Sequence, residues 1–165
     1  MTKVLFVCLG NICRSPMAEM VFKDILNKKG LSNEFFVDSA ATSTEAIGEG
    51  IHHGTRDILK EKQIPLREHI SRQITRKDYN KFDYILGMEQ RNISNILRII
   101  GEDTDNKVYR LLDFCENPRD IADPWYTGNF EITYNDVEEG CAKFLEFIQD
   151  KRSIRWNQKN ILLIW

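Results

Sequence analysis

The sequence predicts one α/β domain, a four-stranded parallel sheet with helices on both of its faces. Three observations lead to this prediction. The chain has 165 residues, 42% of them hydrophobic, which is the size of a single domain with a substantial core. Short apolar runs with the composition of strands recur along it. Helical patterns separate these runs, and that alternation is typical of right-handed βαβ units in a parallel sheet.

The first unit is the clearest. Segment 3–8, KVLFVC, reads as a fully buried strand because its β-branched and aromatic residues run without polar alternation. The next helix is expected to begin with Ser15 as its capping hydroxyl and Pro16 at the first helical position. Apolar residues at four-residue spacing give that helix a wide face for the sheet, and Gly30 ends it.

The remaining elements continue the alternation. A loop rich in Thr, Ser and Gly follows the second strand as far as about Gly50. Thr75 and Asp78 form a T-x-x-D helix start, and Gly101 closes a later helix. The predicted strands are 3–8, 34–40, 82–88 and 107–114. The predicted helices are 15–30, 52–62, 74–82, 90–100 and 130–152.

No internal repeat or linker divides the chain. Residues 1–152 are therefore expected to form the domain, with residues 153–165 as a C-terminal extension. The extension, SIRWNQKNILLIW, is basic at first and then apolar, and it could pack on the domain or contact a partner.

Composition excludes several classes of protein. The net charge of −2 gives no basic field for nucleic acid or an acidic membrane. The first ten residues have too few apolar positions for a secretory signal, and no run approaches the roughly 20 residues that span a bilayer. The four cysteines lack paired CxxC spacing, which argues against structural zinc. We expect a cytoplasmic protein with reduced thiols, no metal and no cofactor.

The loop CLGNICRS joins the first strand to the first helix, where α/β proteins bind ligands. Gly10 and Asn11 are the residue types that most easily take positive φ, so the chain can curl its N–H groups around one point. Such a curl at a helix N-terminus forms an anion cradle. The residues expected to bind the anion are Leu9, Gly10, Asn11, Ile12, Cys13 and Ser15.

Cys8 lies at the rim of this cradle. A free thiol has a pKa of about 8.5, and helix N-termini and cations lower thiol pKa values to roughly 3.5–7.5. We therefore expect Cys8 to be a thiolate nucleophile, with the Arg14 guanidinium binding two oxygens of a phosphoryl group. The Ser15 hydroxyl could hydrogen-bond the sulfur and help it leave. A C-x5-R spacing also arises by chance, but the preceding strand, the Gly-Asn pair and Ser-Pro favour the functional interpretation over a buried apolar cysteine.

Other phosphate-binding motifs are missing from the chain. No GxxxxGK[ST] occurs, which excludes a Walker-type loop, and no GxGxxG follows a strand.

CLGNICRSP, together with DSAAT, SRQIT, FDYILGM and DPWY, resembles the low-molecular-weight protein tyrosine phosphatases over about residues 3–150. The resemblance implies a nucleotide-binding-like phosphatase I topology and hydrolysis of phosphotyrosine through a phosphocysteine, without metal. It also implies phosphotyrosine-containing proteins as substrates and inorganic phosphate as product. The protein is expected to be a monomer or weak homodimer.

The resemblance assigns roles by motif. Cys8 corresponds to the nucleophile, Arg14 to the phosphate-binding arginine, and Asp123 in DPWY to the general acid and base. Pro124 keeps Asp123 out of helical geometry, although an Asp-Pro pair alone is more often an ordinary turn. Trp125 and Tyr126 correspond to aromatic residues that hold the substrate ring; without the resemblance they could be a surface anchor or core filler.

Further matches concern residues around the loop. Ser39 and His69, with Asn11 and Ser15, correspond to a polar network that supports it, whereas His52 and His53 are expected to be solvated helix residues. Glu45, in STEA, stands where the family often has an aromatic residue, which would disfavour acidic peptides.

Cys13 lies beside the nucleophile, as in the family. A reversible Cys8–Cys13 disulfide under peroxide would protect the thiolate, and the alternative is a packing cysteine. Failure of dithiothreitol to restore peroxide-treated enzyme would exclude the protective bridge.

Two rival functions remain. Arsenate reductases of this fold need relay cysteines after the third strand, and GMEQRNISNILRII has none, while Cys115 and Cys141 are far along the chain. A non-catalytic phosphate-binding module would lack one of Cys8, Arg14 and Asp123, yet all three are present.

Overall fold

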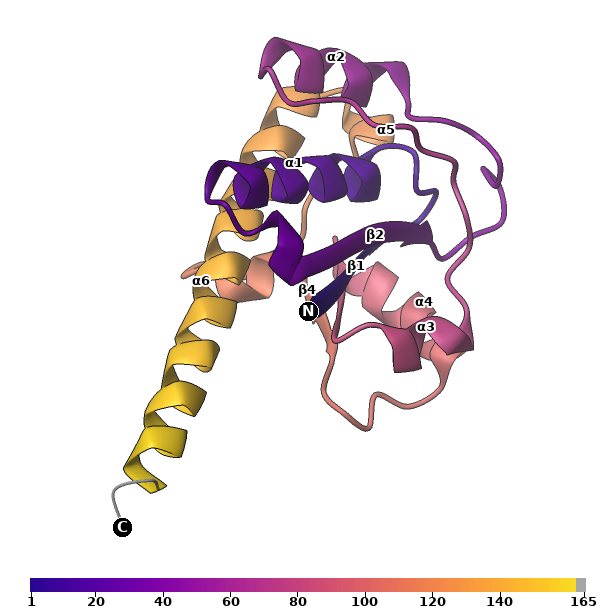
Figure 1. Ribbon diagram of the computed structural model, residues 1–165. Helices are drawn as coiled ribbons and strands as arrows, with labels where there is room; N and C mark the ends of the chain where they lie inside the picture. Colours follow the sequence, from indigo (N-terminus) through magenta and orange to yellow (C-terminus); the bar gives the residue numbers. More distant parts are fainter. Residues whose placement is uncertain (163–165) are drawn as a thin grey trace.

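A computed structural model describes residues 1–162 and has the predicted parallel sheet at its centre (Figure 1). The strand order is β2-β1-β3-β4, and every neighbouring pair is parallel, which confirms the fold class. The strands are β1 (Thr2–Cys8), β2 (Phe35–Ala41), β3 (Tyr84–Gly87) and β4 (Val108–Arg110). All four carboxyl ends therefore meet at one edge of the sheet, where ligands bind in open α/β folds.

Helices cover both faces of the sheet (Figure 1). The helices are α1 (Arg14–Lys28), α2 (His53–Glu61), α3 (Arg76–Lys81), α4 (Gln90–Ile100), α5 (Pro124–Thr127) and α6 (Phe130–Leu162), with 3₁₀ turns η1 (Ser32–Glu34) and η2 (Leu111–Phe114). Alternate β1 residues feed two separate cores, as a strand with period two requires. Phe6 packs with the core under α1 and α6, and Leu5 packs with the core under α3 and α4.

The start of α1 differs from the prediction. The helix begins at Arg14, so Pro16 is the third helical residue rather than the first, and Ser15 is not its cap. Pro16 is tolerated there because the first N–H groups of a helix have no intrahelical acceptor. The capping prediction for Ser15 was wrong; its hydroxyl lies 3.0 Å from the Cys8 sulfur, which is the other contact expected of it. Gly30, with φ of 68°, follows the end of the helix as predicted.

The fourth strand is shorter than predicted. β4 ends at Arg110, and the LLDF that follows forms η2 instead of continuing the strand. The Asp113 carboxylate accepts hydrogen bonds from the Arg110 backbone N–H and Nε, which turns the chain. This turn buries Leu111 and Leu112 completely under α6. The two other predicted helix signals are confirmed: the Thr75–Asp78 capping box starts α3, and Gly101 closes α4.

The last helix is longer than predicted. α6 continues to Leu162, and its final turns extend away from the sheet (Figure 1). Its buried residues include Val137, Cys141, Phe144, Leu145 and Ile148. Residues 153–162 of the predicted extension continue the helix with mostly exposed side chains, and 163–165 lie outside the described residues. The boundary at residue 152 stays a prediction, since the helix runs through it unbroken. Within residues 1–162, no helix is both long and apolar enough to cross a membrane.

Candidate active site

The loop between β1 and α1 curls around the Cys8 sulfur. Asn11 has φ of 57°, as predicted, and its backbone N–H donates to Sγ over 3.3 Å. Gly10 does not take positive φ, so that part of the prediction was wrong; the left-handed turn is made by Asn11 alone within the loop. The Ser15 Oγ lies 3.0 Å from the same sulfur. Cys8 is 3% exposed and ends a buried strand. The Asn11 N–H and the Ser15 hydroxyl both contact its sulfur.

A cavity of about 260 Å³ opens over this loop. It brings together residues that are far apart in the sequence, including the predicted catalytic set. Its lining comprises Cys8, Leu9, Gly10, Ile12, Cys13, Arg14, Glu45, Ala46, Glu49, Asp123, Trp125 and Tyr126. The predicted residues Asn11, Ser15, Ser39 and His69 do not line the cavity but lie behind it.

Arg14 is held by two carboxylates and a carbonyl. Its Nη1 donates to Glu89 Oε2 and, over 3.0 Å, to the Ile121 carbonyl oxygen, and its Nη2 donates to Asp123 Oδ2 over 3.1 Å. Burial by itself lowers the pKa of Arg14, but the charges of Cys8, Asp123 and Glu89 outweigh burial and raise the pKa above its ordinary value. The guanidinium is thus a permanent cation at the base of the cavity.

Glu89 was missed by the sequence reasoning. It follows β3 by two residues, at the carboxyl edge of the sheet where Cys8 also lies. A carboxylate at that edge was the available signal, because neighbouring parallel strands present their ends side by side.

Asp123 precedes α5 in extended geometry, as Pro124 predicted. Its Oδ1 accepts from the Trp125 N–H over 3.1 Å, so one oxygen caps the short helix while the other contacts Arg14. The side chains of Trp125 and Tyr126 are 60% and 78% exposed, which places them at the rim of the cavity rather than in the core. An aromatic substrate could stack there without displacing core residues.

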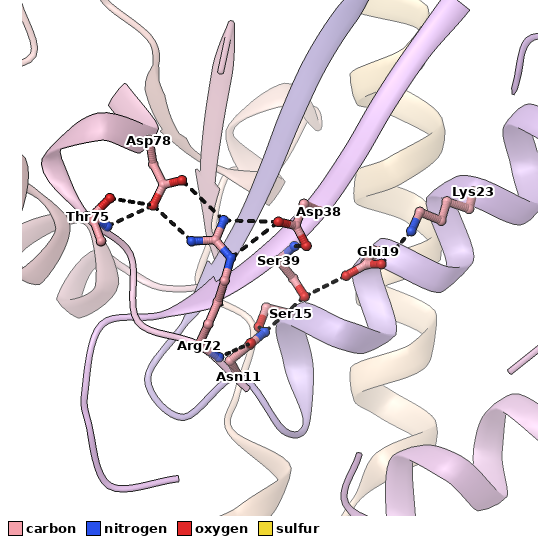
Figure 2. Close-up of polar contacts among 9 residues, drawn as sticks. All are labelled: Asn11, Ser15, Glu19, Lys23, Asp38, Ser39, Arg72, Thr75 and Asp78. Atoms are coloured by element: carbon pink, nitrogen blue, oxygen red, sulfur yellow. Dashed lines mark hydrogen bonds and ion pairs between the residues drawn. The ribbon is translucent and has the colours of Figure 1, made fainter. Parts of the chain in front are cut away.

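The polar network behind the loop is centred on Asn11 (Figure 2). Its Nδ2 donates to Ser15 Oγ over 2.8 Å and to Ser39 Oγ over 3.0 Å, and its Oδ1 accepts from the Arg72 N–H over 3.3 Å. Ser39 in turn donates to Glu19 over 2.7 Å. The amide is therefore bonded on both of its ends, which fixes Asn11 in a left-handed conformation that most side chains adopt only at a cost.

Arg72 extends this network from the loop to α3 (Figure 2). Its guanidinium bridges Asp38, at 3.0 Å, and Asp78, also at 3.0 Å. Those carboxylates raise the pKa of Arg72 against the opposing effect of its burial. Arg72, Glu19 and Asp38 were not singled out from the sequence, although SRQIT and DSAAT contain two of them.

The structure agrees with the prediction for His69 and His53 but not for His52. His69 Nε2 lies 2.7 Å from the Asn11 carbonyl oxygen, so it does contact the loop. His52 is not a solvated helix residue: its Nδ1 accepts from Gly54 N–H, and its ring stacks on Phe130 and meets Trp125 edge-on at 5.5 Å. Burial and then His53 lower the pKa of His52. His52 therefore supports an aromatic residue of the rim, while His53 is exposed as expected.

All four cysteines are free and buried. Burial, followed by the charges of Cys8 and Asp123, raises the pKa of Cys13 to about 12. The Cys8–Cys13 bridge stays a prediction. In residues 1–162 no group of three or more His, Cys, Asp or Glu side chains is arranged to hold a metal ion.

Comparison with known proteins decides the family. Residues 3–154 match the model of the low molecular weight phosphotyrosine protein phosphatases. The chain belongs to this family. The match agrees with the resemblance that the motifs indicate, and it runs from β1 into α6.

Two relatives show how far the likeness extends. The low molecular weight protein-tyrosine-phosphatase YfkJ of Bacillus subtilis is 41% identical over 156 residues, covering 93% of this chain and 100% of the relative. PtpA of Staphylococcus saprophyticus, of the same description, is 39% identical and covers 94% of this chain and 99% of its own.

Solved structures agree. The crystal structure of YfkJ superposes with a TM-score of 0.88 at 42% identity, covering 92% of this chain and 96% of that one. The low molecular weight protein tyrosine phosphatase of Streptococcus pyogenes gives 0.82 at 42% identity, covering 94% and 98%. This chain is accordingly a low molecular weight protein-tyrosine phosphatase with the fold of that family.

Proposed function

We propose that this phosphatase hydrolyses protein phosphotyrosine and small aryl phosphates through a phosphocysteine formed on Cys8. One observation carries the proposal. The thiol, the Arg14 guanidinium and the Asp123 carboxyl converge on one cavity of about 260 Å³ whose rim holds Trp125 and Tyr126. A nucleophile, a phosphate-binding cation, a proton donor and an aromatic rim together are what aryl phosphate hydrolysis requires.

In the first step the Cys8 thiolate attacks phosphorus in line with the aryl oxygen. The S–P bond forms as the P–O bond to the ring breaks, and neutral Asp123 gives its proton to the departing phenolate. Arg14 and the loop N–H groups bind the equatorial oxygens, whose charge persists through the transfer. Because Arg14 Nη2 now contacts Asp123 Oδ2, an incoming phosphoryl group competes for that donor and releases the carboxyl to act as the acid.

In the second step water attacks the phosphocysteine. Asp123, now a carboxylate, accepts the proton of the water, and the S–P bond breaks to give inorganic phosphate. The thiolate that leaves is stabilised by the Asn11 N–H and the Ser15 hydroxyl, which already contact Sγ. Glu89 and the Ile121 carbonyl hold Nη1 and so keep the guanidinium aligned throughout.

The cycle uses only these side chains, and we propose that it needs neither metal nor cofactor. We further propose that the substrates are phosphotyrosine-containing proteins, that the enzyme acts in the cytoplasm, and that it is a monomer or weak homodimer.

Hydrolysis of a phosphotyrosine peptide in the presence of EDTA tests the proposal, with vanadate as inhibitor. We expect turnover that EDTA leaves unchanged and vanadate stops. Turnover that EDTA abolishes would exclude the proposed metal-free mechanism.

The arsenate reductase alternative is tested alongside with arsenate and a thiol reductant. Within residues 1–162, Cys13 is the one other cysteine that lines the cavity, and Cys115 and Cys141 lie in the core under α6. We therefore expect no reduction of arsenate.

A further inference from the structure

The mouth of the cavity has two unlike walls. Trp125 and Tyr126 form the aromatic wall, and the loop after β2 forms the other with Glu45, Ala46 and Glu49. Both glutamates are exposed residues that nevertheless line the cavity. Residues that flank a bound phosphotyrosine would meet this acidic wall, since the phosphoryl group must reach Cys8 at the base.

The acidic wall is fixed to the phosphate-binding loop. Ser71 accepts a hydrogen bond from Gly48 N–H over 2.9 Å and donates its own N–H to the Glu49 carbonyl oxygen over 2.8 Å. The Ser71 hydroxyl donates to the Gly10 carbonyl oxygen over 2.8 Å. One residue thus holds the glutamate loop and the loop around Cys8, so the backbone at Glu49 keeps a defined place beside the site.

The charge of this wall is not neutralised by the protein. Neither the Glu45 nor the Glu49 side chain forms a hydrogen bond or ion pair with any residue of 1–162. Among the described residues that line the cavity, Arg14 is the one cation, and it is 2% exposed and already paired with Glu89 and Asp123. The mouth therefore presents negative potential to the segments on either side of the phosphotyrosine.

We propose that Glu45 and Glu49 make this phosphatase prefer protein substrates with lysine or arginine beside the phosphotyrosine. This rests on the proposed function and names its substrate class. Opposite charges across a binding surface raise association rates and suppress partners of like charge. The carboxylates act on binding of the flanking residues, and the transfer at Cys8 is common to all substrates.

The test uses three phosphotyrosine peptides that differ only in the residues on each side of the phosphotyrosine, which are Lys, Gln or Glu. At low salt we expect kcat/KM to fall in that order, with a Lys-to-Glu ratio of about 5 to 20, as two exposed ion pairs would give. Raising the ionic strength to 0.5 M should bring the ratio close to one, because salt screens exposed charges.

Two double variants show whether Glu45 and Glu49 cause the preference among the peptides. Glu45→Gln/Glu49→Gln should bring the Lys-to-Glu ratio to within about twofold of unity at low salt. Glu61→Gln/Glu102→Gln removes the same charge from exposed positions outside the cavity and should keep the wild-type ratio. Thermal unfolding shows whether each variant is folded.

Equal rates on the three peptides, or a ratio that survives in Glu45→Gln/Glu49→Gln, would overturn the inference while leaving the proposed function intact. Failure to hydrolyse any of the peptides would instead count against the proposed function itself.

Discussion

Arg14 Nη2 lies 3.1 Å from Asp123 Oδ2, although 109 residues separate the two in the chain. This ion pair joins the first residue of α1 to the loop before α5 and couples the proposed phosphate-binding cation to the proposed proton donor. Arg14 is also bound to Glu89, so carboxylates from two different loops share one buried guanidinium. The proposed acid and the proposed phosphate-binding arginine are therefore in direct electrostatic contact.

Replacing Asp123 by Asn tests its role as the acid. The amide keeps the shape of the carboxyl but cannot donate an acidic proton, so we expect kcat to fall by about 10²–10⁴ on phenyl phosphate. The loss should be smaller on 4-nitrophenyl phosphate, whose leaving group needs less protonation. Vanadate inhibition should remain nearly unchanged. Full activity of Asp123→Asn on phenyl phosphate would show that another group protonates the leaving oxygen.

Glu89 is expected to position Arg14. Glu89→Gln keeps an acceptor oxygen for Nη1 but removes the charge, whereas Glu89→Ala removes both. We expect kcat/KM for an aryl phosphate to fall by about 10- to 100-fold in Glu89→Ala and by less in Glu89→Gln. Vanadate should also bind more weakly to Glu89→Ala.

Asp136→Asn is the matched control for this series, because Asp136 pairs with Arg119 away from the cavity. Asp136→Asn should leave kcat/KM and vanadate binding at the wild-type level. Equal kinetics for wild type and Glu89→Ala would show that Glu89 does not position Arg14.

Asn11 combines a backbone role with a side-chain role, and two variants separate them. Asn11→Gly keeps the positive φ but loses the bonds to Ser15 and Ser39, and Asn11→Ala also strains the backbone. Both should lose much of kcat. In urea unfolding, Asn11→Ala should be about 1 kcal/mol less stable than Asn11→Gly. Equal stabilities would mean that the left-handed turn costs the alanine variant nothing.

The buried thiol of Cys13 should make the free energy of unfolding decrease at alkaline pH. Its pKa is about 12 in the folded protein against 9.0 for the reference thiol, chiefly because of burial. Above pH 9 the unfolded state loses this proton first and binds fewer protons than the folded state, so the free energy of unfolding decreases as pH rises toward 12. Urea titrations under reducing conditions at pH 8 and pH 10.5 should show the decrease. Cys13→Ser should show a smaller one, and an identical decrease in both proteins would contradict the assignment.

The fold followed from local patterns. The run KVLFVC, the Thr75–Asp78 capping box and the glycines after α1 and α4 each act within a few residues, and the structure confirms all of them. The errors arose where a competing contact overrides a local capping or strand signal. The Ser15 hydroxyl contacts the Cys8 sulfur instead of capping the helix. The strand predicted at residues 107–114 ends early because Leu111 and Leu112 turn under α6.

The candidate site was predicted in part. The loop from Cys8 to Ser15 is contiguous, so its sequence carries its geometry. Glu89 and Arg72 could not be placed in the same way, because each reaches the loop from a different strand end or loop. Asp123 was assigned by resemblance alone, since no spacing relates it to Cys8 across more than a hundred residues.

The most direct test of the proposed mechanism is to locate the covalent intermediate. Enzyme mixed with 4-nitrophenyl phosphate is quenched in denaturant within milliseconds, digested, and searched by mass spectrometry for a phosphorylated peptide. We predict phosphate on the Cys8 sulfur, accumulating further in Asp123→Asn and missing in Cys8→Ser, which should not turn over. Phosphate on a different side chain, or hydrolysis that persists in Cys8→Ser, would contradict a phosphocysteine mechanism at Cys8.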